Sequence, residues 1–188
     1  MKVHVILLVT LFPLIVIDGS AQTFDSNTKV LSAGVGIGSS LGSSAYTTQS
    51  PGMSLQYEQG IWEIGGPGTV SLGAYLGFKN FGQDYTSFNY NASAKWNYTI
   101  IGVRSAYHYA GLENNRIDVY GGLMLSYNIL NYSIEQSGGQ SVMTNAGSST
   151  AGFTLYVGGR YYFVENIGVF TELGYGISYV NLGLALCF

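Results

Sequence analysis

Several stretches of the chain alternate between apolar residues and small or polar ones, and the clearest of them is Val180–Phe188. Every second position of this stretch is apolar: Val180, Leu182, Leu184, Leu186 and Phe188. The positions between them hold asparagine, glycine, alanine and cysteine. Because successive side chains of a β-strand point to opposite faces, the pattern predicts a strand with one apolar face and one face of small residues.

The same alternation predicts seven further strands upstream, over residues 30–41, 53–61, 70–79, 96–109, 117–130, 153–161 and 167–175. Short turns are expected at 63–68, 112–116 and 164–166. Longer polar loops are expected at 40–52, 80–95 and 131–150. Short turns that alternate with long loops are typical of outer-membrane barrels.

Charged and titratable residues of the predicted strands all fall on the face of small and polar residues. They are Glu58, Lys79, Arg104, His108, Asp118, Arg160 and Glu172. A charge that faces lipid near the middle of a bilayer costs roughly 2–4 kcal/mol, and a soluble barrel would show the reverse segregation. Open strand edges are not tolerated in hydrocarbon. The pattern therefore predicts an all-β protein, an eight-stranded antiparallel up-and-down transmembrane β-barrel whose apolar face meets lipid.

Composition supports this prediction. Only 9% of the 188 residues are charged, against about 25% in a soluble domain. Past the N-terminal segment, no apolar run approaches the ~18 residues of a membrane helix. The net charge of −3 gives no basis for a nucleic-acid partner, and one cysteine cannot form an internal disulfide.

The N-terminal segment has the features of an export signal. Lys2 precedes an apolar run over residues 5–17, and the small residues Gly19 and Ala21 occupy the −3 and −1 positions of a cleavage site. We expect residues 1–21 to be a secretory signal peptide and residues 22–188 to form the barrel domain.

The leader, the stretch from Phe170 to Gly176 and the terminal aromatic strand together carry a family resemblance. The chain resembles the small eight-stranded outer-membrane barrels, such as outer-membrane proteins X and W and the barrel of outer-membrane protein A, in the form common in Bacteroidetes-type bacteria. The resemblance implies export to the cell outer membrane and contact with its lipid and lipopolysaccharide. It also implies that the barrel-assembly machinery reads the terminal strand, a role that falls here to Leu182, Leu184, Leu186 and Phe188.

Inside such a barrel there is room for little more than side chains. We expect Glu58, Arg104, Arg160 and Glu172 to form a polar cluster that plugs the lumen, because buried charges need partners. The alternatives are a catalytic carboxylate site or a narrow pore. His108 is the sole histidine after residue 21, and no serine or aspartate lies at a spacing that would support a triad. We therefore expect no enzyme activity and no cofactor or metal.

Two functions remain open at this point. The first is a structural or surface-interaction protein, monomeric and plugged, whose extracellular loops meet a ligand or another surface. The second is a narrow porin-like channel for ions or small solutes, favoured by the glycines and serines that line the predicted lumen. Pairing of arginine with glutamate across the lumen would distinguish them.

Overall fold

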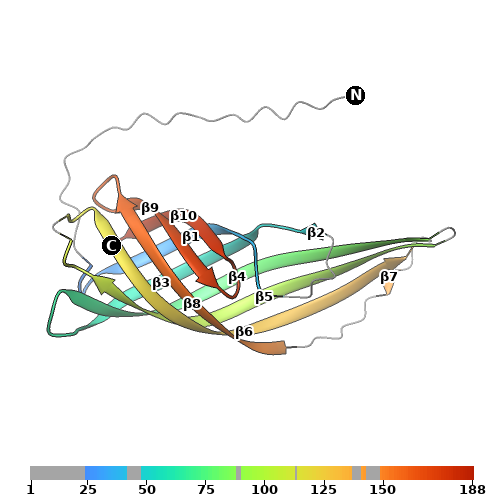
Figure 1. Cartoon of the computed structure of the whole chain (residues 1–188), viewed down its shortest axis with the longest axis horizontal. Helices are drawn as coiled ribbons and strands as arrows, with labels where there is room; N and C mark the ends of the chain where they lie inside the picture. The colour runs from blue at the N-terminus through green and yellow to red at the C-terminus, as the bar shows by residue number, and fades with distance from the viewer. Residues whose placement is uncertain (1–23, 42–47, 88–89, 113, 137–140, 143–148) are drawn as a thin grey trace, which may run out of the picture.

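The computed structural model shows a closed antiparallel barrel and describes residues 24–41, 48–87, 90–112, 114–136, 141–142 and 149–188 (Figure 1). Hydrogen bonding runs around the ring in the order β4 (Gly68–Ser87), β3 (Gly52–Glu63), β1 (Lys29–Ile37), β10 (Val180–Cys187), β9 (Ile167–Tyr175), β8 (Ser149–Tyr162), β6 (Ile117–Gln136) and β5 (Tyr90–Tyr109), and β5 pairs with β4 to close it. Each pairing in the ring joins ring strands that follow one another in the sequence, except the pairing of β1 with β10, which joins the two ends of the chain through residue pairs from Val30–Cys187 to Ile37–Val180. No strand edge is left open in the ring, as a barrel in lipid requires.

These eight strands form the ring. Two short strands extend it: β2 (Thr48–Gln49) pairs with β4, and β7 (Ser141–Val142) pairs with β6. The predicted fold class, with its short turns at one end, is confirmed. We call the end with the turns at 64–67, 110–112 with 114–116, and 163–166 the short-turn end.

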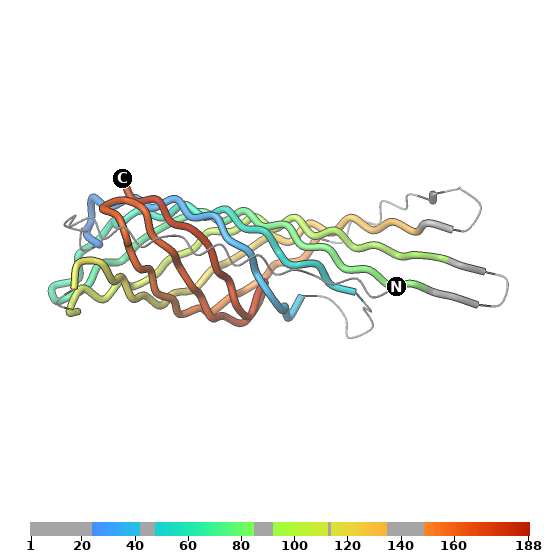
Figure 2. Tube along the Cα trace, turned by 90° about the horizontal axis from the view of Figure 1, so that it is seen from above, coloured from blue at the N-terminus to red at the C-terminus, as the bar shows by residue number. Residues whose placement is uncertain are grey.

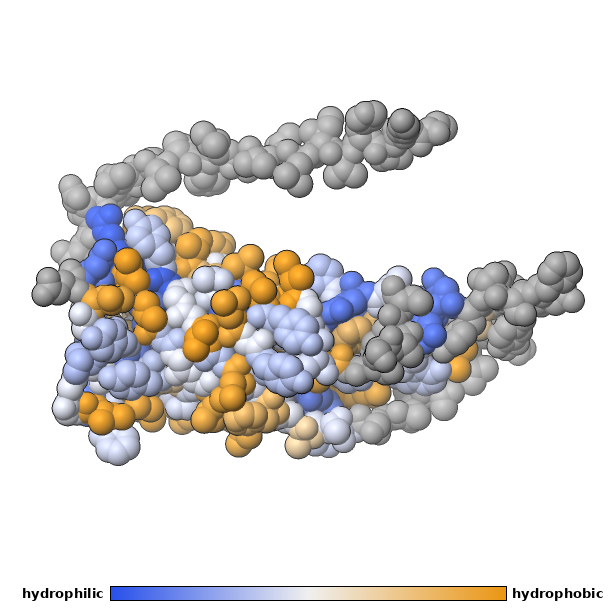
Figure 3. All heavy atoms as spheres, viewed as in Figure 1, coloured by the Kyte–Doolittle hydropathy of each residue, from blue (hydrophilic) through white to orange (hydrophobic). Residues whose placement is uncertain are grey.

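Apolar side chains cover the outside of the barrel body. Val103, Leu125 and Leu184 are each about 60% exposed, and Figure 3 shows such side chains gathered over the strands of the body. The seven charged and titratable residues of the strands that were predicted to face inward are all buried. Because apolar surface of this extent is unfavourable in water, the outside of the barrel is suited to lipid.

Exposed aromatic side chains lie near both ends of the apolar surface. Trp62, Tyr107 and Phe188 are exposed toward the short-turn end, and Phe78 and Tyr175 toward the other. Tryptophan and tyrosine concentrate at membrane–water interfaces because their rings are apolar with a polar edge. The aromatics therefore indicate where the two interfaces would lie.

Three strands are longer than the sequence predicts. β4, β5 and β6 have 20 residues each, whereas β10 has 8, which corresponds to roughly 65 Å against roughly 25 Å of strand. They continue together past the other strands as a ribbon (Figure 2). The prediction of loops over 40–52, 80–95 and 131–150 was therefore wrong for residues 48–49, 52, 80–87, 90–95, 131–136, 141–142 and 149–150, which are strand.

The ribbon was missed because its polarity is inverted. Asn80, Asn97 and Asn131 are in register across β4, β5 and β6 and are all exposed on the outer face. The residues next to these asparagines along each strand lie on the inner face, which continues the lumen wall. They are Phe81, Trp96 and Tyr132, and they too are in register. The apolar face is thus outside along the barrel body and inside along the ribbon. The asparagine row marks the boundary.

The predicted signal peptide, residues 1–21, lies outside the described residues. No helix in the described part of the chain is long and apolar enough to cross a membrane.

Candidate functional site in the barrel lumen

An ion cluster fills the lumen near the short-turn end, and Arg160 of β8 is at its centre. Arg160 Nη1 donates a hydrogen bond to Asp118 Oδ2 at 2.8 Å, and Nη2 donates to Glu58 Oε2. Asp118 and Arg160 are directly paired across β6 and β8. Glu58 is on β3, four strands from β8 in the ring of eight. The Arg160–Glu58 pair therefore bridges opposite walls of the barrel.

A second ion cluster lies next to the first, around Arg104 of β5. Arg104 Nη2 donates to Glu172 Oε1 of β9 at 2.6 Å, and Nη1 donates to Gln56 Oε1 of β3 at 2.6 Å. Gln56 Nε2 donates in turn to Glu172 Oε2 at 3.3 Å. The structure thus brings together the four predicted lumen residues as two pairs, Arg104 with Glu172 and Arg160 with Glu58. Gln56 is a member that sequence reasoning missed.

Tyr120 of β6 connects the two clusters. Its hydroxyl donates to Glu172 Oε1 at 3.0 Å, and its ring lies under the Arg160 guanidinium at 4.3 Å. The Arg104 guanidinium lies over the Tyr156 ring at 4.2 Å in the same way. Because a cation over an aromatic face is attracted to it, each arginine is held both by carboxylates and by a ring.

Glycines on the lumen face make room for these long side chains. Gly158 is in register with Glu172, and a Cβ at Gly158 would lie 2.8 Å from Tyr120 Cζ and 2.9 Å from Glu172 Cγ. Gly73 is likewise in register with Arg104. The glycines of the predicted inward face therefore leave the space that the long charged side chains occupy.

His108 has a serine and an aspartate beside it, so the expectation that neither would support it was wrong. His108 Nδ1 lies 2.8 Å from Asp118 Oδ1, and Nε2 lies 3.1 Å from Ser71 Oγ. The strands bring these residues together although their spacing in sequence gives no sign of it. The order Ser71–His108–Asp118 is that of a catalytic triad.

The surroundings of this trio favour a structural role. Glu58 Oε1 accepts the Ser71 hydroxyl at 2.5 Å and also lies 3.1 Å from His108 Nε2. A carboxylate is thus closer to the serine proton than the imidazole is, and each ring nitrogen of His108 has a carboxylate oxygen within hydrogen-bonding distance. Ser71 is 0% exposed. A nucleophile must be accessible to its substrate. In this arrangement Ser71 is a buried hydrogen-bond donor to Glu58 of the ion cluster.

Phe24, just before the first strand, closes the lumen at the short-turn end. Its ring stacks on His108 with centroids 3.5 Å apart and planes at 5°, and it is buried among Val30, Tyr162 and Phe170. The turn after it is fixed by Asp25, whose carboxylate accepts the backbone N–H groups of Asn27 and Thr28. The segment before the first strand is too short to show an alternating pattern, so the sequence did not indicate a role for Phe24.

We expect Phe24→Ala to lower the free energy of unfolding by about 2 kcal/mol. This is less than the 3–5 kcal/mol of a phenylalanine deleted from a closed core, because water can enter the space left at the barrel end. Urea unfolding of the refolded chain in detergent measures it. Trp62→Ala is the matched control, since Trp62 is exposed at the same end. Equal midpoints for Phe24→Ala and the unchanged protein would contradict the closing role.

The turn between β9 and β10 folds over the other end of the lumen. Gly176 has φ of 145°, a conformation open to glycine, and its carbonyl accepts hydrogen bonds from Ser40 N at 2.9 Å and Ser40 Oγ at 2.8 Å. The neighbouring Ile177 is buried and packs with the apolar lumen residues. Lys79 Nζ donates to the Gly38 carbonyl at 2.6 Å and ties β4 to the same region.

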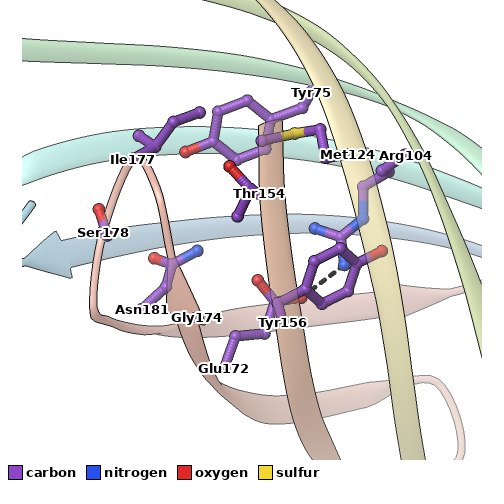
Figure 4. Close-up of a pocket in the computed structure, with 10 residues that line it drawn as sticks. All are labelled: Tyr75, Arg104, Met124, Thr154, Tyr156, Glu172, Gly174, Ile177, Ser178 and Asn181. Atoms are coloured by element: carbon purple, nitrogen blue, oxygen red, sulfur yellow. Dashed lines mark hydrogen bonds and ion pairs between the residues drawn. The ribbon is translucent and has the colours of Figure 1, made fainter. Parts of the chain in front are cut away.

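Between Ile177 and the Arg104–Glu172 pair lies a cavity of about 30 Å³, which is room for about one water. Figure 4 shows its lining, with Arg104 and Glu172 joined at one side and Ile177, Thr154 and Asn181 at the other. Among the described residues, no group of three or more histidine, cysteine, aspartate or glutamate side chains could hold a metal ion.

The residues of the proposed assembly signal lie on the outside of β10. Leu182, Leu184, Leu186 and Phe188 are between 40% and 64% exposed. They therefore belong to the apolar outer surface and have no part in the lumen clusters.

No family model and no curated protein sequence matches the chain. Solved structures do match. The attachment invasion locus protein Ail of Yersinia pestis is 14% identical, with a TM-score of 0.47 over 87% of this chain and 99% of Ail. Ail in complex with the heparin analogue sucrose octasulfate is 12% identical, with a TM-score of 0.47 over 86% and 97%. Neisserial surface protein A is 17% identical, with a TM-score of 0.44 over 86% and 96%.

The architecture itself is clear from the chain's own strands. The ring is antiparallel and closed, it has an even number of strands, its outside is apolar and its inside is polar and charged. These are the features of a barrel built to cross a membrane with its strands. The chain thus has the fold of the small eight-stranded outer-membrane barrels.

Proposed function

We propose that this protein is an outer-membrane barrel with a side-chain-plugged lumen, and that it acts as a structural or surface-interaction protein through the parts that extend beyond the membrane. The observation that carries the proposal is the pairing of Arg160 with Glu58 and of Arg104 with Glu172 across the lumen. The two arginines and their two glutamates therefore neutralise each other across the lumen.

The plug is supported along the whole axis of the barrel. Phe24 lies at the short-turn end, the two ion clusters follow, and Ile177 covers the opposite end. Arg104, Arg160 and Glu58 are each 2% exposed. A conducting pore needs a continuous polar path that water can fill, and these contacts oppose one.

The outer surface supports an outer-membrane location after export. The apolar side chains meet lipid, and the asparagine row of the ribbon (Asn80, Asn97 and Asn131) lies at the lipopolysaccharide side. We infer that the exposed apolar residues of β10, from Leu182 to Phe188, are what the barrel-assembly machinery reads during insertion. The ribbon of β4, β5 and β6 then extends beyond the membrane as a surface for an extracellular ligand.

Single-channel conductance of the refolded mature chain, residues 22–188, in a planar bilayer tests the plug. We expect no steady current. We also expect that serine at all four positions, Glu58, Arg104, Arg160 and Glu172, opens a path and produces current, because both ion pairs across the lumen are removed at once. Asn97→Ser and Asn131→Ser, outside the lumen, are the control and should stay silent.

A steady current through the unchanged protein would overturn the plug. A current that also rises when Arg104 or Glu172 alone is neutralised would make the cluster a gate, and the narrow porin-like channel for ions or small solutes would replace the proposed function. Silence in every variant would show that Phe24 and Ile177 close the lumen without the ion pairs.

A further inference from the structure

A chamber of about 270 Å³ opens at the base of the ribbon, above the lumen plug. Its floor is Ile177 and Thr154, which also line the small cavity beside Arg104. Its walls come from β5, β6 and β8 and from residues 40–41, which follow β1, and they include Tyr98, Asn128 and Ser40. It is therefore separate from the ion clusters and faces the ribbon end.

The lining of this chamber is polar without charge. Hydroxyl groups come from Ser40, Ser126, Thr150 and Thr154, and an amide from Asn128. Hydroxyls both donate and accept hydrogen bonds, and an amide offers both kinds of group. No charged side chain is among the described residues that line it. The Arg104–Glu172 ion pair lies below the floor, where the Nη groups of Arg104 bond to Glu172 and Gln56.

Asn128 is the best-placed donor. Its Oδ1 accepts a hydrogen bond from Ser126 Oγ at 3.1 Å, which fixes the orientation of the amide. Its Nδ2 has no hydrogen bond to another described residue and is oriented toward Gly152, where a Cβ would lie 2.7 Å from it. Gly152 thus gives this side chain its space at the chamber wall.

Apolar groups complete the lining. Leu41 and Ile177 contribute aliphatic carbon, and Tyr98 contributes an aromatic ring that is set edge-to-face against Phe81 at 5.6 Å. A volume of 270 Å³ corresponds to roughly nine waters, which is close to the size of one sugar ring. A sugar ring presents hydroxyls around its edge and C–H groups on its face, and both have partners here.

We propose that this chamber binds a neutral sugar ring. The proposal deepens the surface-interaction function given above and rests on it, since it names the chemistry of the extracellular ligand. The ring inserts between Tyr98 and Ile177, and its hydroxyls bond to Asn128, Ser126 and Thr154. The ring is either a free monosaccharide or the terminal residue of a surface glycan, and both present the same groups.

Saturation-transfer NMR on the refolded mature chain in detergent tests this proposal with neutral methyl glycosides, sugar acids, and neutral oligosaccharides that end in the same ring. We expect neutral methyl glycosides to bind at millimolar Kd and sugar acids at least about tenfold more weakly, because a carboxylate would be buried without a cation. Oligosaccharides that bind as well as the single ring would identify a glycan terminus. Oligosaccharides that fail would identify the free sugar.

Two variants of the lining and one matched control make the test specific. Asn128→Leu and Thr154→Val each remove polar groups at nearly constant volume, and each should weaken binding by about tenfold. Asn131→Leu makes the same change on the same strand but on the exposed outer face, and should bind as the unchanged protein does. Heat-modifiable migration on a gel confirms that each variant is folded.

Absence of binding by every neutral sugar, or unchanged affinity in both Asn128→Leu and Thr154→Val, would overturn the proposal. Stronger binding by sugar acids than by neutral rings would also overturn it. These results are independent of conductance. A barrel that carries no current and binds no sugar would support the plug and overturn the sugar site. A barrel that conducts and binds sugar would overturn the plug and support the sugar site.

Discussion

Replacing Arg160 with methionine is expected to lower the free energy of unfolding by about 3–5 kcal/mol, the range for breaking a buried ion pair by removing one partner. Methionine keeps much of the length of the side chain but donates no hydrogen bond. Glu58 and Asp118 would then stay buried with their contacts to the His108 imidazole but without the guanidinium that bonds to both of them. Reversible unfolding of the refolded chain in lipid, followed by tryptophan fluorescence, measures the change.

A compensated variant separates charge from packing. Arg160→Met combined with Glu58→Gln and Asp118→Asn removes the stranded carboxylates, and we expect it to recover more than half of the loss, because neutral amides are cheaper to bury than ions. Arg116→Met is the matched single control, at a partly exposed turn position, and should change stability by less than about 1 kcal/mol. An unfolding midpoint of Arg160→Met equal to that of the unchanged protein would exclude the cluster as a source of stability.

An arginine on the lipid face is the second large effect. Val103 lies near the middle of the apolar outer face of β5 and is 59% exposed. We expect Val103→Arg to cost about 2–4 kcal/mol in a bilayer, the value for a cation near the midplane of a barrel in lipid. The measurement is the unfolding free energy in liposomes of fixed composition.

The control for this change lies on the same face of the same strand. Asn97 is exposed in the asparagine row, so Asn97→Arg should cost no more than about 1 kcal/mol, as near an interface. Equal costs at Val103 and Asn97 would contradict both the lipid contact and the boundary at the asparagine row. A large cost at Asn97 alone would place the membrane around the ribbon.

The barrel body could be predicted from sequence because its two faces meet different solvents. Lipid outside and side chains inside impose a strict period of two, which is visible in strands such as β9 and β10. The ribbon keeps that period but has the apolar residues on the opposite face. Because apolar residues were expected on the outer face, the polar outer positions around Asn80 and Asn97 were predicted to be loop.

The candidate site was predictable only in part. Sequence alternation assigned Glu58, Arg104, Arg160 and Glu172 to the lumen, since a face is a local property of a strand. The pairing among these four residues depends on the order of the strands in the ring and on the stagger between them. Neither can be read from a local sequence pattern. The part of Gln56 in the cluster was missed for the same reason, and so was the approach of Ser71 and Asp118 to His108. Phe24 was missed because it precedes the first strand, where there is no alternating pattern.

By itself, then, the sequence determined the strand count of the barrel body, the direction of each face and the segregation of charge, because these follow from the two-residue period and the cost of an ion in lipid. Only the tertiary structure decided the partners: closure of the ring brings β3 opposite β8 and folds Phe24 and Ile177 over the lumen ends. Contacts across a lumen join residues that are distant along the chain, and their geometry is set when the ring closes.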